Sequence, residues 1–131
     1  MASTLNPYLS FKSDAREAME FYQSVFGGQL DVMTFGQMGG EPADGVMHSY
    51  LGTDQGFALM GSDTPEQMGE PSPNGSVSLS GDDPELRTWW DQLSDGGQVT
   101  MPLEKQAWGD EFGMLVDKFG VTWLVNVSAG G

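Results

Sequence analysis

Residues 108–127 read W-G-D-E-F-G-M-L-V-D-K-F-G-V-T-W-L-V-N-V, and this stretch decides the fold. Its second half alternates large apolar residues with a second set, namely Val121, Trp123, Val125 and Val127 against Thr122, Leu124 and Asn126. A period of two is typical of a strand that buries one face. Another apolar strand precedes it, and residues 117–120 join the two. We expect the first face to pack on helices and the mixed face, which carries Leu124, to hold any chemistry.

The two halves of the chain follow one pattern, a strand, a helix and three further strands. The strands are expected at 6–11, 29–35, 46–51 and 57–62 in the first half, and at 76–80, at 98–105 and twice within 108–127 in the second. Adding 69 to the numbers of Gly27, Gly28 and Gln29 gives Gly96, Gly97 and Gln98. The turn Asp54 to Gly56 is matched with Asp117 to Gly120. A period near half the chain length indicates a duplicated βαβββ unit.

This repeat predicts an α+β fold, a single domain of two βαβββ modules at about 5–63 and 75–128, with a proline-rich linker at 64–74. Each module alone has one helix on one curved sheet, so one face of the sheet stays open. Two modules side by side would enclose a pocket lined by the faces that do not touch the helices. The modules could pair within one chain or between two chains, and the sequence leaves both open.

Each expected helix begins at an aspartate and ends at a pair of glycines. Asp14 with Glu17 three residues later predicts a capping box, and Asp83 before Pro84 predicts a second cap. Spacings of three and four give each helix an apolar stripe, made of Ala15, Ala18, Met19, Tyr22, Val25 and Phe26 in the first and of Leu86, Trp89, Trp90 and Leu93 in the second. One of the two adjacent tryptophans is expected in the core, and the other at a dimer contact.

Composition narrows the classes of function. The chain has 131 residues and no cysteine, which excludes disulfides, thiolate nucleophiles and zinc–thiolate sites. Nineteen acids against five bases give a net charge of −14, a field that repels phosphate backbones and anionic lipids, so no nucleic-acid and no membrane partner is expected. The absence of a membrane-spanning run and of a signal-like start favours a soluble, cytoplasmic protein. Whether the charge reflects a salt-adapted host stays open.

His48 is the leading candidate for chemistry, because it is the only histidine and imidazole exchanges protons near neutral pH. Tyr50 shares its side of the expected strand, and Ser10 lies on the polar side of the first strand. The plainer alternative is that His48 is a hydrogen-bonded residue near the pocket or a subunit interface.

Other candidates also carry two interpretations. Ser76 and Ser78 place hydroxyls along one strand face, where they would bind a polar ligand or serve as small residues in a tight barrel. Trp108 would cover a ligand or pack over the sheet edge. Methionines such as Met33 and Met60 would line an adaptable apolar pocket or fill the core. Asp110 and Glu111 are interpreted as solvated turn charges.

The segments N-P-Y-L-S-F…A-R-E-A-M-E-F-Y…V-F-G-G at 6–28 and W-G…F-G…V-D-K-F-G-V-T-W-L-V-N at 108–126 resemble the PhnB-like branch of the vicinal-oxygen-chelate superfamily. That superfamily includes glyoxalase I, the bleomycin- and fosfomycin-resistance proteins and extradiol dioxygenases. The resemblance implies a pocket and, in metal-dependent members, His, Glu or Gln ligands from four strands. Carried over one at a time, those positions fall at Asn6 or Pro7, Met60, Ser76 and Leu124. Since thioether and alkyl groups do not bind hard divalent cations, no metal ligand and no cofactor are predicted, although a divalent metal stays open.

The sequence therefore predicts a small-molecule-binding protein, expected to be a homodimer, that sequesters a compound in a pocket without the usual metal ligands. The predicted ligand contacts are Ser10, His48, Tyr50, Met60, Ser76, Ser78, Trp108 and Leu124. One alternative is a glyoxalase-type lyase or isomerase in which His48 is the catalytic acid–base group. Another is a structural or interaction module. The identity of the ligand is beyond the sequence, because pocket shape decides it.

Overall fold

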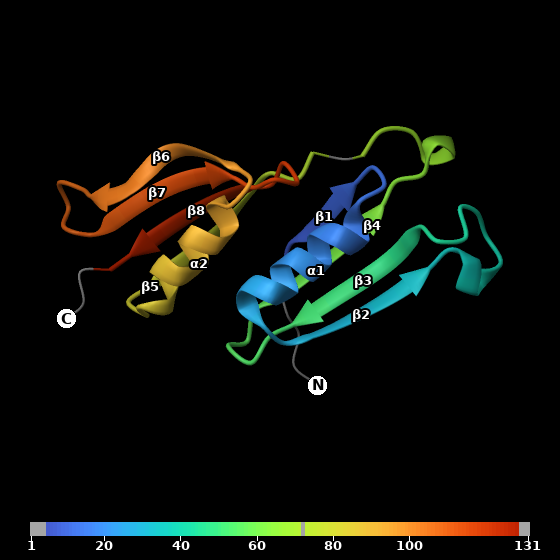
Figure 1. Ribbon diagram of the computed structural model, residues 1–131, viewed down its shortest axis with the longest axis horizontal. Coiled ribbons are helices and arrows are strands. Elements are labelled where there is room, and N and C mark those ends of the chain that lie inside the picture. Colours follow the sequence, from blue (N-terminus) through green and yellow to red (C-terminus); the bar gives the residue numbers. More distant parts are fainter. Residues whose placement is uncertain (1–4, 72, 129–131) are drawn as a thin grey trace. The chain divides into compact units, whose positions relative to one another are not determined.

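The computed structural model in Figure 1 describes residues 5–71 and 73–128. The chain divides between Asn74 and Gly75 into two compact units. The first unit contains β1 (Tyr8–Phe11), α1 (Ala15–Phe26), β2 (Gln29–Thr34), β3 (Val46–Gly52) and β4 (Ala58–Asp63), with 3-10 turns η1 (Gly36–Met38) and η2 (Glu66–Met68). The second unit contains β5 (Ser76–Gly81), α2 (Glu85–Ser94), β6 (Gln98–Lys105), β7 (Glu111–Val116) and β8 (Thr122–Val127).

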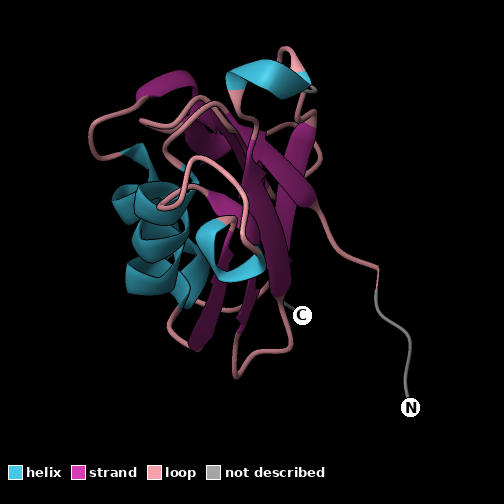
Figure 2. Ribbon diagram, turned by 90° about the vertical axis from the view of Figure 1, so that its right-hand side faces the viewer, coloured by secondary structure: helices cyan, strands magenta, loops and turns pink. Residues whose placement is uncertain are grey.

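Each unit has its own four-stranded mixed sheet, and the two strand orders are equivalent. The first sheet runs β1-β4-β3-β2 and the second β5-β8-β7-β6. In both, the first strand pairs in parallel with the last, and the other pairs are antiparallel. One helix lies along one side of each sheet, as the cyan coils and magenta strands of Figure 2 show. The predicted α+β fold with a repeated βαβββ order is confirmed, and the described strands form two open sheets without a closed barrel.

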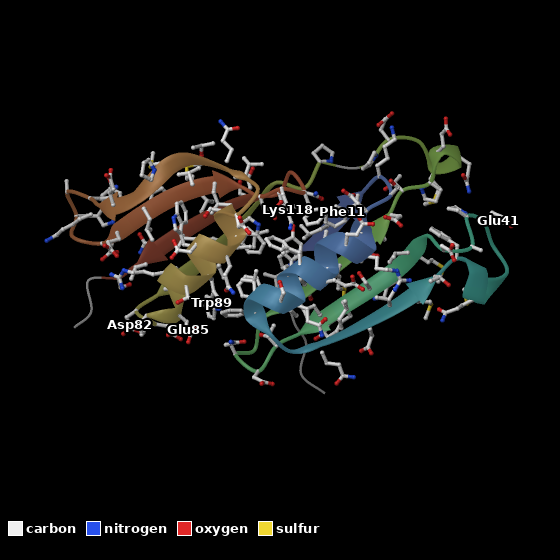
Figure 3. The ribbon with its side chains drawn as sticks, in the orientation of Figure 1. Phe11, Glu41, Asp82, Glu85, Trp89 and Lys118 are labelled. Atoms are coloured by element: carbon white, nitrogen blue, oxygen red, sulfur yellow. The ribbon has the colours of Figure 1, made fainter. Side chains whose placement is uncertain are left out.

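The predicted helix stripes form the core of each unit. The buried residues of α1 and α2 are those that the three-and-four spacing selected. Trp89 and Trp90 are both buried, at 4% and 8% exposure, so the prediction that one of them stays free for a dimer contact is wrong. Figure 3 shows Trp89 on α2, with Asp82 and Glu85 at the start of that helix. Trp123 is 1% exposed and lies in the core, as expected.

The N-terminus of α1 is capped by a residue distant in the sequence, which the sequence analysis did not predict. Asp14 precedes α1 but its side chain makes no capping hydrogen bond, so the predicted capping box is wrong. The buried Asp63 at the end of β4 takes that role, because its Oδ1 accepts a hydrogen bond from the Ala15 N–H at 2.9 Å. Its Oδ2 accepts another from the Val46 N–H at 2.8 Å. One carboxylate therefore joins the start of α1, the start of β3 and the end of β4.

The second helix begins closer to the prediction. Asp83 Oδ1 accepts a hydrogen bond from the Glu85 N–H at 2.9 Å, as a capping side chain does. The helix starts at Glu85, one residue after the proline that was expected to open it.

The duplication is visible in the glycines that follow each helix. A Cβ atom on Gly28 would lie 2.2 Å from the carbonyl oxygen of Gly52, and one on Gly97 would lie 2.3 Å from that of Val116. Both glycines let the chain leave the helix in contact with a strand backbone, where any side chain would clash.

The turns after β3 and β7 also match, although not with the predicted register. The Thr53 hydroxyl accepts a hydrogen bond from the Phe57 N–H at 3.0 Å, and Asp117 Oδ1 accepts one from the Val121 N–H at 3.1 Å. Thr53, not Asp54, is thus the equivalent of Asp117. Asp117 is buried, and its Oδ2 also accepts a hydrogen bond from the Trp123 indole N–H at 2.9 Å.

The segment predicted as a linker is fixed to the first unit at several described points. The Thr64 N–H donates to the Phe11 carbonyl at 2.7 Å, and Pro65 is buried. Within the described residues, no helix is long and apolar enough to cross a membrane.

Candidate functional site

The face of the first sheet that points away from α1 is termed the open face, and it carries most of the predicted site residues of this unit. Strand registry places on it Tyr8, Ser10, Met33, His48, Tyr50, Met60 and Ser62. The residues between them, such as Leu9 and Ser49, are fully buried on the helix side. Tyr8 is 47% exposed and Met33 42%, whereas His48, Tyr50 and Met60 are half-buried.

A tyrosine and the only histidine meet on the open face. The Tyr8 hydroxyl and His48 Nδ1 lie 3.1 Å apart and are hydrogen bonded, with the donor set by the imidazole tautomer. Their rings stack with centroids 5.8 Å apart and an interplanar angle of 30°. Because β4 lies between β1 and β3, the pair bridges that strand on the side where Met60 stands. Tyr8 was not predicted as a site residue, although it alternates with Ser10 on the same strand face.

Tyr50 and the two methionines surround this pair. Met60 has Tyr8 as its neighbour on β1 and Tyr50 as its neighbour on β3, and Met33 lies directly opposite His48 on β2. The Tyr50 ring lies over Gly52, since a Cβ on that glycine would be 3.0 Å from the ring. The open face therefore combines aromatic rings, thioethers and one polar pair. Such a mixture suits a ligand with an apolar body and one hydrogen-bonding group.

The backbone of Ser10 is hydrogen bonded to the side chain of Asn74. Its N–H donates to Asn74 Oδ1 at 2.7 Å, and its carbonyl accepts from Asn74 Nδ2 at 3.1 Å. The asparagine side chain thus pairs with the outer edge of β1 as a neighbouring strand would. This contact fixes the edge of the open face and leaves the half-buried serine hydroxyl on that face.

The remaining predicted residues belong to the second unit. Ser76 and Ser78 are exposed on the side of the second sheet away from α2, and Leu124 is the β8 neighbour of Ser78. The sheet thus brings these three together. Ser10, His48, Tyr50 and Met60 lie on the open face of the first unit.

Trp108 lies in the turn between β6 and β7. It is 64% exposed, and its ring centroid is 6.3 Å from that of Phe112 at an angle of 59°. Phe112 pairs with Asn126 on the face away from α2. The indole is thus partly packed against that face and still accessible.

The acids Asp110, in this turn, and Glu111, which begins β7, are partly exposed, and each also has a polar partner. Asn126 Nδ2 donates to Asp110 Oδ2 at 3.0 Å. Glu111 forms an ion pair with Arg87 of α2.

Two open depressions lie elsewhere. One of about 510 Å³ is lined by Lys12, Ser13, Glu41, Pro42, Thr64, Pro65, Glu66 and Gln67. Figure 3 shows Glu41 at its place in the loop between β2 and β3. The other, of about 530 Å³, lies between α2 and β6 and is lined by Arg87, Trp90, Asp91, Val99, Pro102, Leu103, Glu104 and Glu111. Neither contains a residue that the sequence predicted for the site.

The side chains at the positions carried over from metal-dependent relatives do not fit a hard divalent cation. They are an amide or a proline ring, a thioether, a hydroxyl and an alkyl group, whereas such a cation needs imidazole and carboxylate donors. Among the residues that the structure describes, no three or more His, Cys, Asp or Glu side chains are grouped to hold a metal ion. Whether the protein works without a divalent metal stays a prediction.

Comparison with known proteins identifies the family. The model of the glyoxalase/bleomycin resistance protein/dioxygenase superfamily matches residues 4–125. The chain belongs to that superfamily. Protein YjdN of Escherichia coli strain K12 is 31% identical over 140 aligned positions, which cover 94% of each chain.

Two solved structures are similar to the chain over nearly its whole length. The crystal structure of protein PA1353 from Pseudomonas aeruginosa has a TM-score of 0.84 and 36% identity, over 97% of this chain and 98% of that one. A Bacillus cereus PhnB protein, named a putative 3-demethylubiquinone-9 3-methyltransferase, has a TM-score of 0.76 and 25% identity, over 96% of this chain and 100% of that one. The resemblance to the PhnB-like branch of the glyoxalase superfamily is thereby confirmed.

Proposed function

We propose that this glyoxalase-superfamily protein binds a small organic molecule on the open face of its first sheet. The observation that carries the proposal is the hydrogen-bonded, stacked pair of Tyr8 and His48 on the face of the first sheet that points away from α1. The pair keeps hydrogen-bonding capacity for a ligand, because the imidazole has a second ring nitrogen. Met60 and Tyr50 supply apolar surface beside it. The ligand would thus lay a flat apolar body over Met60 and form its hydrogen bond with His48 or Tyr8.

The surrounding charge favours a neutral or cationic ligand over an anionic one. The chain carries a net charge of −14, and Asp31 lies opposite Tyr50 on the same face. Such a field lowers the local concentration of anions and raises that of cations. Within the proposal the protein sequesters its ligand in the cytoplasm as a homodimer. Light scattering tests the dimer, since one chain has a mass of 14.1 kDa.

The test is a ligand screen by thermal shift on metal-free protein. Suitable probes are bleomycin, whose name the superfamily carries, and small neutral or cationic aromatic compounds. At 100 times its dissociation constant a ligand stabilises the native state by about 2.7 kcal/mol, which raises Tm by about 5 °C or more. His48→Ala and Tyr8→Phe should reduce this shift, and Ser24→Ala, an exposed change on α1, should not. A ligand whose shift survives both open-face variants would bind elsewhere and contradict the proposal.

The Tyr8 contact also favours a second candidate function, a glyoxalase-type lyase or isomerase. A histidine held in one orientation by a neighbour is suited to act as a general acid or base. In that case His48→Ala would abolish turnover of a bound compound while the protein remains folded. Saturable binding without turnover would favour sequestration. Retention of a protein partner without any small-molecule ligand would favour an interaction module.

A further inference from the structure

The open face holds the donor set of a soft monovalent cation. Met33, His48 and Met60 offer two thioether sulfurs and one imidazole nitrogen on one side of three adjacent strands. Thioether sulfur is a poor ligand for hard divalent ions, but it selects Cu(I) and other soft ions, and imidazole suits copper as well. We propose that these three side chains form a binding site for Cu(I) and for its redox-inert analogue Ag(I).

Strand registry brings the three donors within reach of one ion. Met33 and His48 are direct cross-strand partners, and such residues have Cβ atoms about 4.5–5.5 Å apart. Met60 is diagonal to His48 on the other side, because it pairs with Tyr50, two residues further along β3. Diagonal neighbours are about 7–8 Å apart, a distance that long side chains span. Methionine is unbranched and adaptable, so both sulfurs can turn toward the imidazole.

The hydrogen bond to Tyr8 prepares the histidine for this role. Metal-binding imidazoles use one ring nitrogen as the ligand and commonly engage the other in a hydrogen bond that sets tautomer and orientation. Here Nδ1 is hydrogen bonded to the Tyr8 hydroxyl, 3.1 Å away. When Nδ1–H donates to the phenolic oxygen, the lone pair of Nε2 is available for the ion. Tyr8 is then a positioning residue and not a ligand.

The local backbone and the charge are consistent with a cation at this place. The registry between β2 and β3 shifts between Met33 and Thr34, a bulge that redirects the side chains beside it. Asp31 stands on the same face, and the net charge of −14 attracts cations. Binding of Cu(I) goes beyond the proposed function and does not require an organic ligand.

The experiment titrates the full chain with Ag(I) in chloride-free buffer, and with Cu(I) under anaerobic conditions against a chromogenic Cu(I) chelator. Methionine labelled with ¹³C in its methyl group reports each sulfur separately. One equivalent of ion should shift the methyl signals of Met33 and Met60 and the Nε2 signal of His48. Met38 and Met68 are more exposed, at 67% and 63%, and their signals should stay unchanged.

Matched variants separate this site from general methionine affinity. Met33→Leu, Met60→Leu and His48→Gln should each weaken binding by about 10-fold or more, and Tyr8→Phe should also weaken it by about 10-fold, the usual effect of losing a partner of a metal-bound histidine. Met38→Leu is the control and should bind as the unchanged protein does. Circular dichroism establishes that each variant is folded.

The inference is overturned if no ion binds at one equivalent, or if the exposed methionine signals move as much as those of Met33 and Met60. It is also overturned if the double variant Met33→Leu/Met60→Leu binds the ion with an affinity within 2-fold of that of the unchanged protein. Failure here is distinct from failure of the proposed function. The organic-ligand screen is run with a copper chelator present, and the metal titration without any organic probe.

Discussion

The buried Asp63 should control the stability of the first unit, whereas Asp14, which precedes α1 directly, should not. Asp63 accepts two backbone hydrogen bonds, from Ala15 at 2.9 Å and from Val46 at 2.8 Å. Hydrogen bonds to a charged group contribute about 1.5–3 kcal/mol each. Ala15 and Val46 are 0% and 1% exposed, so Asp63→Ala leaves two buried N–H groups without their acceptor. We therefore expect Asp63→Ala to lower the free energy of unfolding by about 4 kcal/mol.

Two variants make the comparison measurable. Asp63→Asn keeps one oxygen acceptor but turns an NH₂ group toward the other backbone N–H, and it should lose about 2 kcal/mol. Asp14→Ala removes only a favourable charge near the helix N-terminus and should lose about 1 kcal/mol or less, since Asp14 makes no capping bond.

Urea unfolding followed by circular dichroism gives the values. With a denaturant slope of about 2 kcal/mol/M, the midpoint should fall by about 2 M for Asp63→Ala and by about 0.5 M or less for Asp14→Ala. Equal losses for the two aspartates would show that Asp63 does not cap the helix. So would a loss below about 1 kcal/mol for Asp63→Ala.

Three further perturbations test other parts of the fold. Gly28→Ala should lower the free energy of unfolding by more than about 3 kcal/mol, because its Cβ would meet the Gly52 carbonyl oxygen at 2.2 Å. Gly27→Ala has open space around it and should lower that free energy by about 1–2 kcal/mol, from its positive φ alone, so equal losses in urea unfolding would refute the close approach at Gly28. Asp117→Asn should lose about 1–3 kcal/mol and move the indole N–H signal of Trp123 in a ¹H–¹⁵N spectrum, and an unmoved signal would contradict the bond between them. Arg87→Ala should lower the free energy of unfolding by less than about 1 kcal/mol, since the side chains of its ion pair with Glu111 are 54% and 32% exposed. A larger loss would mean that the pair is more shielded from water than this exposure implies.

Local patterns in the sequence were sufficient to predict the helices, the strands and the buried core residues. The stripe on α1 and the alternation in β8 depend on periods of 3.6 and 2, which neighbouring residues reveal. The repeat spacing gave the duplicated order of strands. The repeat also placed Gly28 and Gly97 at the same point of each unit, but the spacing did not show that each glycine lies against a strand backbone.

Contacts between distant positions could not be predicted in the same way. Asp63 lies 48 residues from Ala15, and Tyr8 lies 40 residues from His48. Nothing in the spacing of Asp63 shows that its carboxylate turns back to α1, and the nearer Asp14 satisfied the local rule. The pairing of Tyr8 with His48 depends on β4 lying between their strands, which is a property of the sheet order. The parity of Tyr8 with Ser10 was the available signal.

Ligand binding on the open face around Tyr8 and His48 can be observed directly with methionine labelled with ¹³C in its methyl group. A ¹³C-methyl spectrum is recorded on metal-free protein with bleomycin and the neutral or cationic aromatic compounds of the thermal-shift screen. We expect compounds that bind to shift the methyl signals of Met60 and Met33 and to leave those of the exposed Met38 and Met68 in place. In His48→Ala these shifts should be lost. Compounds that stabilise the protein without moving the Met60 signal would contradict this expectation.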